Sequence, residues 1–350
     1  MGARNAQTAT STTATAAILL SEWIPVIGLI FGGCCSNVFA LESLVREVPK
    51  CGNLITFGQF AFITLVGLPS HMQLGWVPRL KPRQVPIQRW MVMVTLYFCV
   101  SVLNNLALGY NISIPLHIVF RSSGLIANML CGYFVMNKQY PRMQALAVVM
   151  VTIGVVMATL SSVNGTREQN GLMSDSVIGI GLLSLGVVFA ALLGLYQEQT
   201  YLKYGKHWRE GLFYNHLLAL PMFLFFYKDI GHQIHALSRS RPVELGELPL
   251  VGALLGSNRI SVPHLWISLL VNVLSQWACA SGVHQMTSMS TSLTLNVVLN
   301  LRKLVSLVVS VLLFQNPVTP GMMAGCLLVF AGTFAYSKLR PAVPVSKKQE

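Results

Sequence analysis

The stretch SMSTSLTLNVVLNLRKLVSLVVSVLLF, residues 288–314, holds two basic side chains inside a segment that is otherwise apolar. An earlier stretch, IPLHIVFRSSGLIANMLCGYFVM at residues 114–136, holds one more. Each stretch is long enough to be a membrane span, because about 20 apolar residues in a helix cross the hydrocarbon core. A cation at the centre of a span costs about 2.5–3.5 kcal/mol on insertion scales. Arg121, Arg302 and Lys303 therefore predict a cavity near the bilayer midplane that binds an anion.

The composition is that of a membrane protein. The chain has 350 residues, of which 53% are hydrophobic and 10% charged, and its mean hydropathy is +0.61. Soluble domains carry about 25% charged residues, so this chain could not cover a water-facing surface. The net charge of +13 comes from basic residues scattered over short connections between apolar spans. That distribution reflects topology and does not indicate a nucleic-acid partner.

Span counting predicts an all-α protein with ten transmembrane helices in a lipid bilayer. If both ends are cytosolic, the cytosolic segments carry about twice as many lysines and arginines as the opposite side, as the positive-inside rule requires. The first 22 residues are rich in Ser, Thr and Ala and are expected to form a disordered cytosolic N-terminus. The expected spans are 23–42, 53–70, 90–110, 114–136, 143–162, 176–197, 212–228, 264–284, 288–314 and 319–337.

Two parts of the chain resemble each other, which predicts an internal repeat. FRSSGLIANMLCGYFVMNKQYP (120–141) and LRKLVSLVVSVLLFQNPVTP (301–320) both begin near a basic residue, reach an Asn-containing turn and end on a proline. Gly154 and Gly332 follow at similar distances. The two halves would be 23–162 and 176–337, joined by a lumenal connection at 163–175. Because five spans is an odd number, the second half must run the opposite way, as in many secondary transporters.

Two short sequence signals suggest where in the cell the protein resides. Lys347 and Lys348 lie four and three residues from the end, in the cytosolic tail 338–350, and resemble the dilysine signal that coat proteins read for retrieval to the endoplasmic reticulum. Asn164 begins an Asn-Gly-Thr sequon on the side expected to be lumenal, where a used and a chance sequon are equally plausible.

The cysteines suggest neither a disulfide framework nor a zinc site. Six of the seven lie within apolar spans, so they are expected to be small buried apolar residues. We expect no metal and no cofactor.

One helix face in residues 288–314 gathers polar groups. Asn296, Asn300 and Lys303 share a face at i, i+4 and i+7 spacing, whereas Arg302 is rotated by about 100°. Lys303 is thus favoured as the ligand contact, with Arg302 pairing to another helix. Arg121 suits a phosphate through two parallel hydrogen bonds, although a structural carboxylate partner is the alternative.

Further polar residues could line the same cavity. Asn128 lies seven residues after Arg121, and Asn104 either lines the cavity or bonds between helices. Glu42 and Glu198 near span ends could couple protons, but structural pairing with the cations is favoured. An aromatic ring beside an amide suits a planar base, which is the reading for Tyr214, Asn215 and His216, with a satisfied helix-end histidine as the alternative for the last.

The longest motifs resemble those of the nucleotide-sugar transporters of the drug/metabolite transporter superfamily. They are PLHIVFRSSGLIANM (115–129), LYQEQTYLKYGKHWREGLFYNH (195–216) and LRKLVSLVVSVLLFQNPVT (301–319). GGCCSNVFALESLVREVPKCGNLITFGQF (32–60) resembles the subgroup that carries UDP-xylose and UDP-N-acetylglucosamine, with members in the endoplasmic reticulum that also handle GDP-fucose. The resemblance covers residues 23–340.

The resemblance implies an antiporter of the endoplasmic reticulum or Golgi membrane that exchanges a cytosolic nucleotide sugar for a nucleoside monophosphate. Tyr214 and Asn215 match the family's base-binding motif, and Lys303 matches the phosphate-binding lysine of its ninth helix. His216 stands where GDP-mannose transporters carry a second Asn, so guanine contacts do not transfer. A homodimer is left open.

Three other functions fit the sequence less well. A membrane glycosyltransferase would need paired carboxylates, yet the chain has only two aspartates, Asp175 and Asp229, far apart in sequence. The protein is therefore not expected to be an enzyme. A carrier of another organic anion is the nearer alternative, and a trafficking scaffold is suggested only by the tail.

Overall fold

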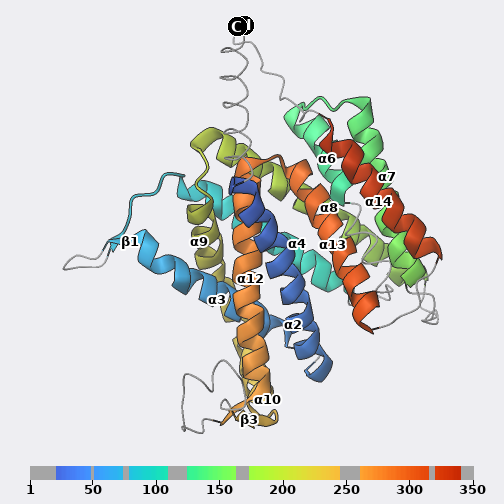
Figure 1. Ribbon diagram of the computed structural model, residues 1–350. Coiled ribbons are helices and arrows are strands. Elements are labelled where there is room, and N and C mark those ends of the chain that lie inside the picture. Colours follow the sequence, from blue (N-terminus) through green and yellow to red (C-terminus); the bar gives the residue numbers. More distant parts are fainter. Residues whose placement is uncertain are drawn as a thin grey trace, which may run out of the picture. The chain divides into compact units, whose positions relative to one another are not determined.

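The chain is almost entirely helical where a computed structural model describes it, at residues 21–48, 51–73, 79–108, 124–162, 173–244, 261–314 and 320–339. Figure 1 shows that the described elements are mostly long helices. Four of the predicted functional residues, Arg121, Asn164, Lys347 and Lys348, lie outside these described ranges.

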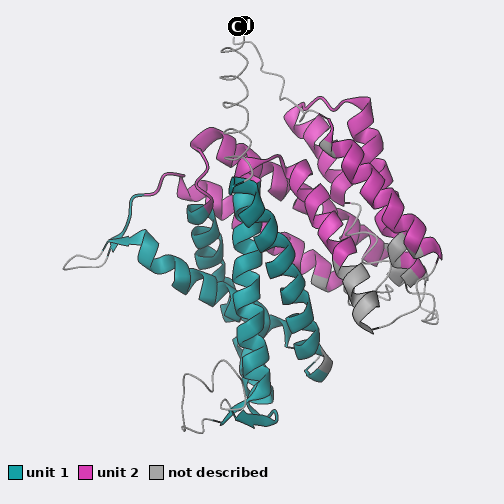
Figure 2. Ribbon diagram, in the orientation of Figure 1, with its two compact units in different colours: residues 1–82, 209–286 teal, residues 83–208, 287–350 magenta. Residues whose placement is uncertain are grey.

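The described helices form two compact units, coloured teal and magenta in Figure 2. Unit 1 combines residues 1–82 with 209–286, and unit 2 combines 83–208 with 287–350. Each unit thus takes helices from both of the halves expected from the sequence, 23–162 and 176–337. Such mixing means that neither half packs as a separate domain.

Where the structure describes it, unit 1 is built on three long helices and a broken one. The broken helix changes from α to 3-10 geometry after Ala219, at the leucine that precedes Pro221, since proline removes a backbone donor. The elements are η1 (Leu29–Gly33), α2 (Cys34–Glu47), α3 (Gly52–His71), α9 (Trp208–Ala219), η2 (Leu220–Phe226), α10 (Tyr227–Ser238) and α12 (His264–Met289), with the antiparallel pairs β1 (Met72–Gln73) with β2 (Arg79–Leu80) and β3 (Pro242–Glu244) with β4 (Ser261–Pro263).

A disulfide joins α2 to α12, which corrects the expectation that the cysteines are all free apolar residues. Cys34 and Cys279 are bonded, 245 residues apart in sequence, with their Cα atoms 4.6 Å apart. A methyl group added to Gly33 would lie 2.7 Å from the backbone nitrogen of Cys279, so the two helices touch through backbone. Spacing in the sequence could not reveal this pair, because helix contact alone brings the two sulfurs together.

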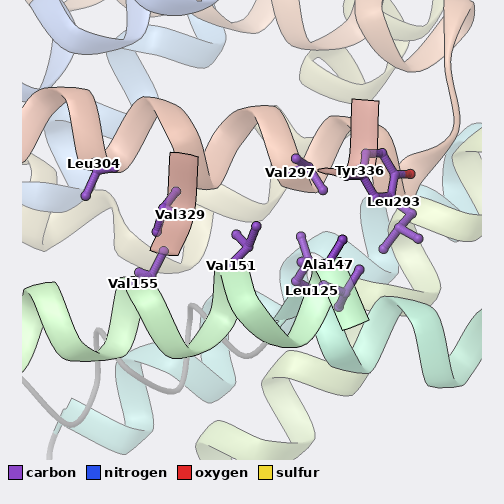
Figure 3. Packing of buried hydrophobic residues seen from close by; sticks show 10 residues of the cluster. Leu125, Ala147, Val151, Val155, Leu293, Val297, Leu304, Val329 and Tyr336 are labelled. Carbon is purple, nitrogen blue, oxygen red and sulfur yellow. The ribbon is translucent and has the colours of Figure 1, made fainter. Parts of the chain in front are cut away.

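The described part of unit 2 contains six helices, and its core lies between α6, α7, α13 and α14. The six helices are α4 (Ile87–Leu108), α6 (Gly124–Met136), α7 (Arg142–Ser162), α8 (Met173–Tyr204), α13 (Ser292–Phe314) and α14 (Pro320–Ser337). Figure 3 shows Val151 and Val155 of α7 directed toward Val329 of α14. These buried side chains belong to one apolar cluster that also includes Leu125, Leu293 and Val297.

Glycines let α7 and α14 approach closely. A Cβ on Gly154 would lie 2.7 Å from the carbonyl oxygen of Gly325, and one on Gly332 would lie 3.0 Å from that of Ala147. Gly154, late in α7, lies against Gly325, early in α14. Ala147, early in α7, lies against Gly332, late in α14, so the two helices run antiparallel. Small residues at such crossings are typical of helix pairs within membranes.

Five described helical segments are long and apolar enough to cross a membrane: Ser21–Val45, Gly52–His71, Ile87–Asn104, Ile178–Tyr204 and His264–Met289. Shorter apolar helices occupy Gly124–Met136, Arg142–Met157 and Met323–Tyr336. Large side chains such as Phe134, Leu202 and Phe225 are well exposed, which suits a surface in contact with lipid. The molecule is therefore a multi-pass helical membrane protein.

Candidate functional site

A cavity of about 260 Å³ lies within unit 2, between α4, α6, α8 and α13. Its polar lining comes from five of the residues singled out in the sequence: Asn104, Asn296, Asn300, Arg302 and Lys303. Drug-sized ligands usually occupy about 300–1,000 Å³, so this cavity accommodates part of a larger molecule. Its two cations and three amides suit an anionic, hydroxyl-bearing ligand.

Both cations of α13 line this cavity. Arg302, expected to point away from Lys303 and to pair with another helix, also lines the cavity, because a long side chain can bend round the helix from a neighbouring position. The ammonium of Lys303 donates to the amide oxygen of Asn300, 3.1 Å away, and Asn300 itself is only 4% exposed. The buried amide therefore fixes the direction of the lysine.

Asn104 lines the cavity from α4. It lies beside α8 at Gly186, where an added Cβ would come within 3.7 Å of its amide oxygen. The short glycine keeps this approach open, so α4 and α8 together present an amide to the cavity.

Asn128 does not line the cavity, contrary to the prediction from its spacing. Its side chain is fully buried, and its amide oxygen lies 3.2 Å from the hydroxyl of Ser292. A Cβ added to Gly194 of α8 would lie 3.5 Å from the same amide group. Asn128 therefore packs between three helices and takes part in their contact.

A buried ion pair lies at one end of the same three helices. The ammonium of Lys138 is 2.5 Å from one carboxylate oxygen of Glu198, and both side chains are about 5% exposed or less. The other carboxylate oxygen accepts hydrogen bonds from the backbone nitrogen and the hydroxyl of Ser292, at 2.9 and 2.8 Å. Burial, followed by the Glu198 charge, raises the pKa of nearby Tyr140.

Sequence reasoning missed the role of Lys138, which was counted among water-facing connections. The cationic partner of Glu198 was sought among the intramembrane cations instead. The signal available was an Asn-Lys pair directly after an apolar helix, but nothing local in the sequence links it to Glu198, 60 residues away.

The residues expected to bind a base belong to unit 1, on α9. Tyr214 is 2% exposed, and its ring meets those of Phe213 and His71 edge-on. His71 stacks flat on Phe213 with centroids 4.4 Å apart. A base can therefore stack on Tyr214 only after neighbouring side chains move. Asn215 is half-buried beside it.

His216 has the features of a structural histidine. Its Nδ1 lies 2.6 Å from the carbonyl oxygen of Leu212, one turn earlier in α9, and its ring packs against Phe60 at 4.6 Å between centroids. The ring of His284 lies 6.3 Å away. These contacts favour the alternative in which His216 is satisfied within its own helix.

A network of amides holds unit 1 together and was not anticipated. The side chain of Asn37 donates to the backbone oxygen of Asn272 at 2.9 Å, and Gln59 donates to the Asn272 side chain at 2.7 Å. These bonds join α2, α3 and α12, as interhelical amides do in membranes. Glu42, on α2, is half-buried.

Comparisons with known proteins agree on one family. The model of the UAA transporter family matches residues 22–340. A Danio rerio protein called UDP-xylose and UDP-N-acetylglucosamine transporter is 41% identical, covering 92% of this chain and 96% of its own. The UDP-N-acetylglucosamine transporter yea4 of Schizosaccharomyces pombe is 41% identical, covering 90% and 95%. A solved crystal structure has a TM-score of 0.61 at 12% identity, over 91% of this chain and 98% of its own, which shows a common fold.

Proposed function

This chain belongs to the UAA transporter family, and from that membership we propose that it carries UDP-N-acetylglucosamine and UDP-xylose into the lumen in exchange for a nucleoside monophosphate. The chain is a transporter and no covalent chemistry is required. GDP-fucose is an additional candidate substrate. Exchange with a smaller anion retains part of the phosphate contact in both directions, which suits a site built on fixed cations.

One observation carries this proposal. Relatives about 41% identical over at least 90% of the chain, from an animal and a yeast, both bear names that include UDP-N-acetylglucosamine transport. The family match covers residues 22–340, so it includes the segments that line the cavity.

The cavity of unit 2 gives a chemical reason why the protein would bind a nucleotide sugar. Lys303 and Arg302 would neutralise the diphosphate, while Asn104, Asn296 and Asn300 would bind phosphate or sugar hydroxyls. At about 260 Å³ the cavity suits the phosphate part better than a whole nucleotide sugar. Arg121, from the sequence, is proposed as a further phosphate contact.

The base is proposed to bind at Tyr214 and Asn215 after the aromatic side chains around them rearrange. His216 would support that helix from within and would not touch the ligand. A stacked base on a tyrosine, read at its edge by an amide, is a common arrangement for planar ligands.

Ten spans in two inverted halves, 23–162 and 176–337, form the proposed architecture. Support comes from α7 and α14, which would be the fifth and tenth spans. In their antiparallel contact, a glycine of each helix lies against a valine of the other: Gly154 against Val329, and Gly332 against Val151. An inverted repeat with its two-fold axis in the membrane plane generates this kind of pairing.

We propose that the protein resides in the membrane of the endoplasmic reticulum or Golgi, with both termini in the cytosol. Lys347 and Lys348 would be read there by coat proteins, and Asn164 would be exposed to the lumenal glycosylation machinery. A homodimer is compatible with the exposed apolar surfaces of the helices.

Exchange in proteoliposomes tests the function. Vesicles containing the purified full-length protein are preloaded with UMP or GMP and offered labelled UDP-N-acetylglucosamine, UDP-xylose or GDP-fucose. We expect UMP-loaded vesicles to accumulate the UDP-sugars faster than empty ones. If no nucleotide sugar enters faster than into protein-free vesicles, the proposed function is wrong.

A further inference from the structure

The carboxylate of Glu198 is the meeting point of three chain segments at one end of unit 2. Lys138 reaches it from the connection after α6, and Ser292 reaches it as the first residue of α13. Glu198 itself lies near the end of α8. The same three helices line the cavity that is proposed to hold the phosphates.

Local geometry aims Lys138 inward. Helix α6 ends at Met136, and Asn137 adopts the left-handed conformation with φ of 50°. The backbone nitrogen of Lys138 then donates to the carbonyl oxygen of Gly132 at 3.0 Å, which folds the chain back over the helix end. This reversal, which asparagine tolerates better than most residues, leaves Lys138 only 3% exposed.

Glu198 also caps α13, the helix that carries Lys303. The hydroxyl of Thr291 accepts a hydrogen bond from the backbone nitrogen of Thr294 at 3.2 Å, as a local helix cap does. The carboxylate of Glu198 accepts one from the backbone nitrogen of Ser292, although it belongs to another helix. A carboxylate is favoured at a helix N-terminus by the helix dipole as well as by these donors. The capping contact therefore fixes this end of α13 onto α8.

The ion-pair cluster lies close to the cavity. Along the helices, the steps from Ser292 to Asn296 and from Glu198 to Ala191 are about 6 and 10 Å at 1.5 Å per residue. On α6, Asn128 lies one helical turn after the cavity-lining Gly124, and its amide oxygen is 3.2 Å from the hydroxyl of Ser292. The ion-pair cluster and the cavity are therefore neighbours along all three helices.

A buried ion pair adds little to the permanent stability of a helix contact. Removing two charges from water costs nearly as much free energy as their attraction restores, so a well-packed apolar pair would stabilise the contact equally well. Charged groups do offer an alternative state, because each is well solvated once water enters. Their use here fits a contact that forms and breaks.

We propose that Glu198, Lys138 and Ser292 form a latch that closes one end of the phosphate cavity and must open during transport. The inference rests on the proposed function, because only a carrier that alternates has to open this end. In the latched state these contacts hold α6, α8 and α13 together beside the cavity. In the open state water solvates Glu198 and Lys138, and the N-terminal turn of α13 separates from α8.

The test separates a latch from a structural brace by means of a neutral pair. Glu198→Gln alone leaves the Lys138 ammonium buried without a carboxylate and should lower thermal stability. Adding Lys138→Met removes that charge, while the amide oxygen introduced at position 198 can still accept from Ser292, so stability should return to the wild-type value. Glu47→Gln, which breaks the exposed pair with His264 in unit 1, is the matched control.

Hydrogen–deuterium exchange of the substrate-free, full-length protein in nanodiscs is the deciding measurement. In the double variant we expect amides at 137–140 and 292–295 to exchange about tenfold more slowly than in the wild type and the control, because a neutral pair gains little from water in the open state and local opening becomes harder. Unchanged or faster exchange at these amides, with stability restored, would overturn the latch. This readout needs no substrate, so it remains decisive even if the liposome assay finds no nucleotide-sugar transport.

Discussion

At the scale of single residues, the cations of α13 decide what the cavity can bind. Lys303 is held by Asn300 at 3.1 Å, and Arg302 shares the same cavity. A helical-wheel argument assigned only one of them to the ligand, since neighbouring residues differ by about 100°. Long, flexible side chains are not confined to the direction of their Cα–Cβ bond, so both cations can line the cavity although they differ in direction along the helix.

Lys303→Gln should weaken substrate binding without unfolding the protein. Losing a hydrogen bond to a charged group costs about 1.5–3 kcal/mol, which is about ten- to hundredfold in the half-saturating concentration of the UDP-sugar. Concentration series in the exchange assay would measure it. Lys203→Gln, at the end of α8 and away from the cavity, should transport as the wild type does; equal loss in both variants would contradict a specific phosphate contact.

The disulfide between Cys34 and Cys279 predicts a simple thiol count. Five cysteines are free, namely Cys35, Cys51, Cys99, Cys131 and Cys326. Alkylation of the denatured protein before reduction should therefore add five labels by intact mass, and alkylation after reduction should add seven. Seven labels without reduction would show that the two helices meet without a covalent bond.

At the scale of helices, apolar length predicts position well and contacts poorly. A span was expected at 143–162 and α7 occupies Arg142–Ser162, because the run of apolar residues itself sets the helix. The burial of Lys138 and Asn128 was not predictable in the same way. Each depends on Ser292 or Glu198, which lie 60 or more residues away, and no local period encodes such a partner.

The contact between α7 and α14 should be sensitive to a single methyl group. In Gly154→Ala the new Cβ would approach the backbone oxygen of Gly325 to 2.7 Å, so the helices must separate. Overpacking of this kind costs about 1–3 kcal/mol. A lower midpoint of thermal unfolding in detergent would show it. Gly181→Ala in α8 has nothing within 4 Å of the new atom and serves as the control; an equal midpoint for both variants would mean that α7 and α14 adjust freely.

Gly332→Ala should repeat that result from the other side of the contact. Its Cβ would lie 3.0 Å from the backbone oxygen of Ala147 and 2.9 Å from Val151. If α7 and α14 are equivalent elements of an inverted repeat, the two glycine variants should lose stability to a similar extent. A loss confined to one of them, measured in the same unfolding experiment, would show that the contact is not symmetric in energy.

At the scale of the whole molecule, the two compact units and the two proposed halves divide the chain differently. Unit 2 combines α4, α6, α7 and α8 with α13 and α14, so it takes helices from both halves. The sequence indicates the halves because it preserves similarity between residues 120–141 and 301–320. It does not indicate the units, since these depend on which helices pack together after both halves are inserted.

The proposed orientation of the chain follows from the inverted halves and can be tested directly. With five spans in each half, the connection at 163–175 must lie on the opposite side of the membrane from both termini. The excess of lysine and arginine in the terminal segments and in the other connections on their side supports cytosolic termini. Epitope tags are placed at the N-terminus, after residue 168 and at an internal position before the final lysines. After selective permeabilisation of the plasma membrane, antibodies should reach both terminal tags, and the tag at 168 only once internal membranes are opened. Detection of all three tags under the first condition would mean that an even number of spans separates the tag at 168 from each terminus, which the inverted repeat does not allow.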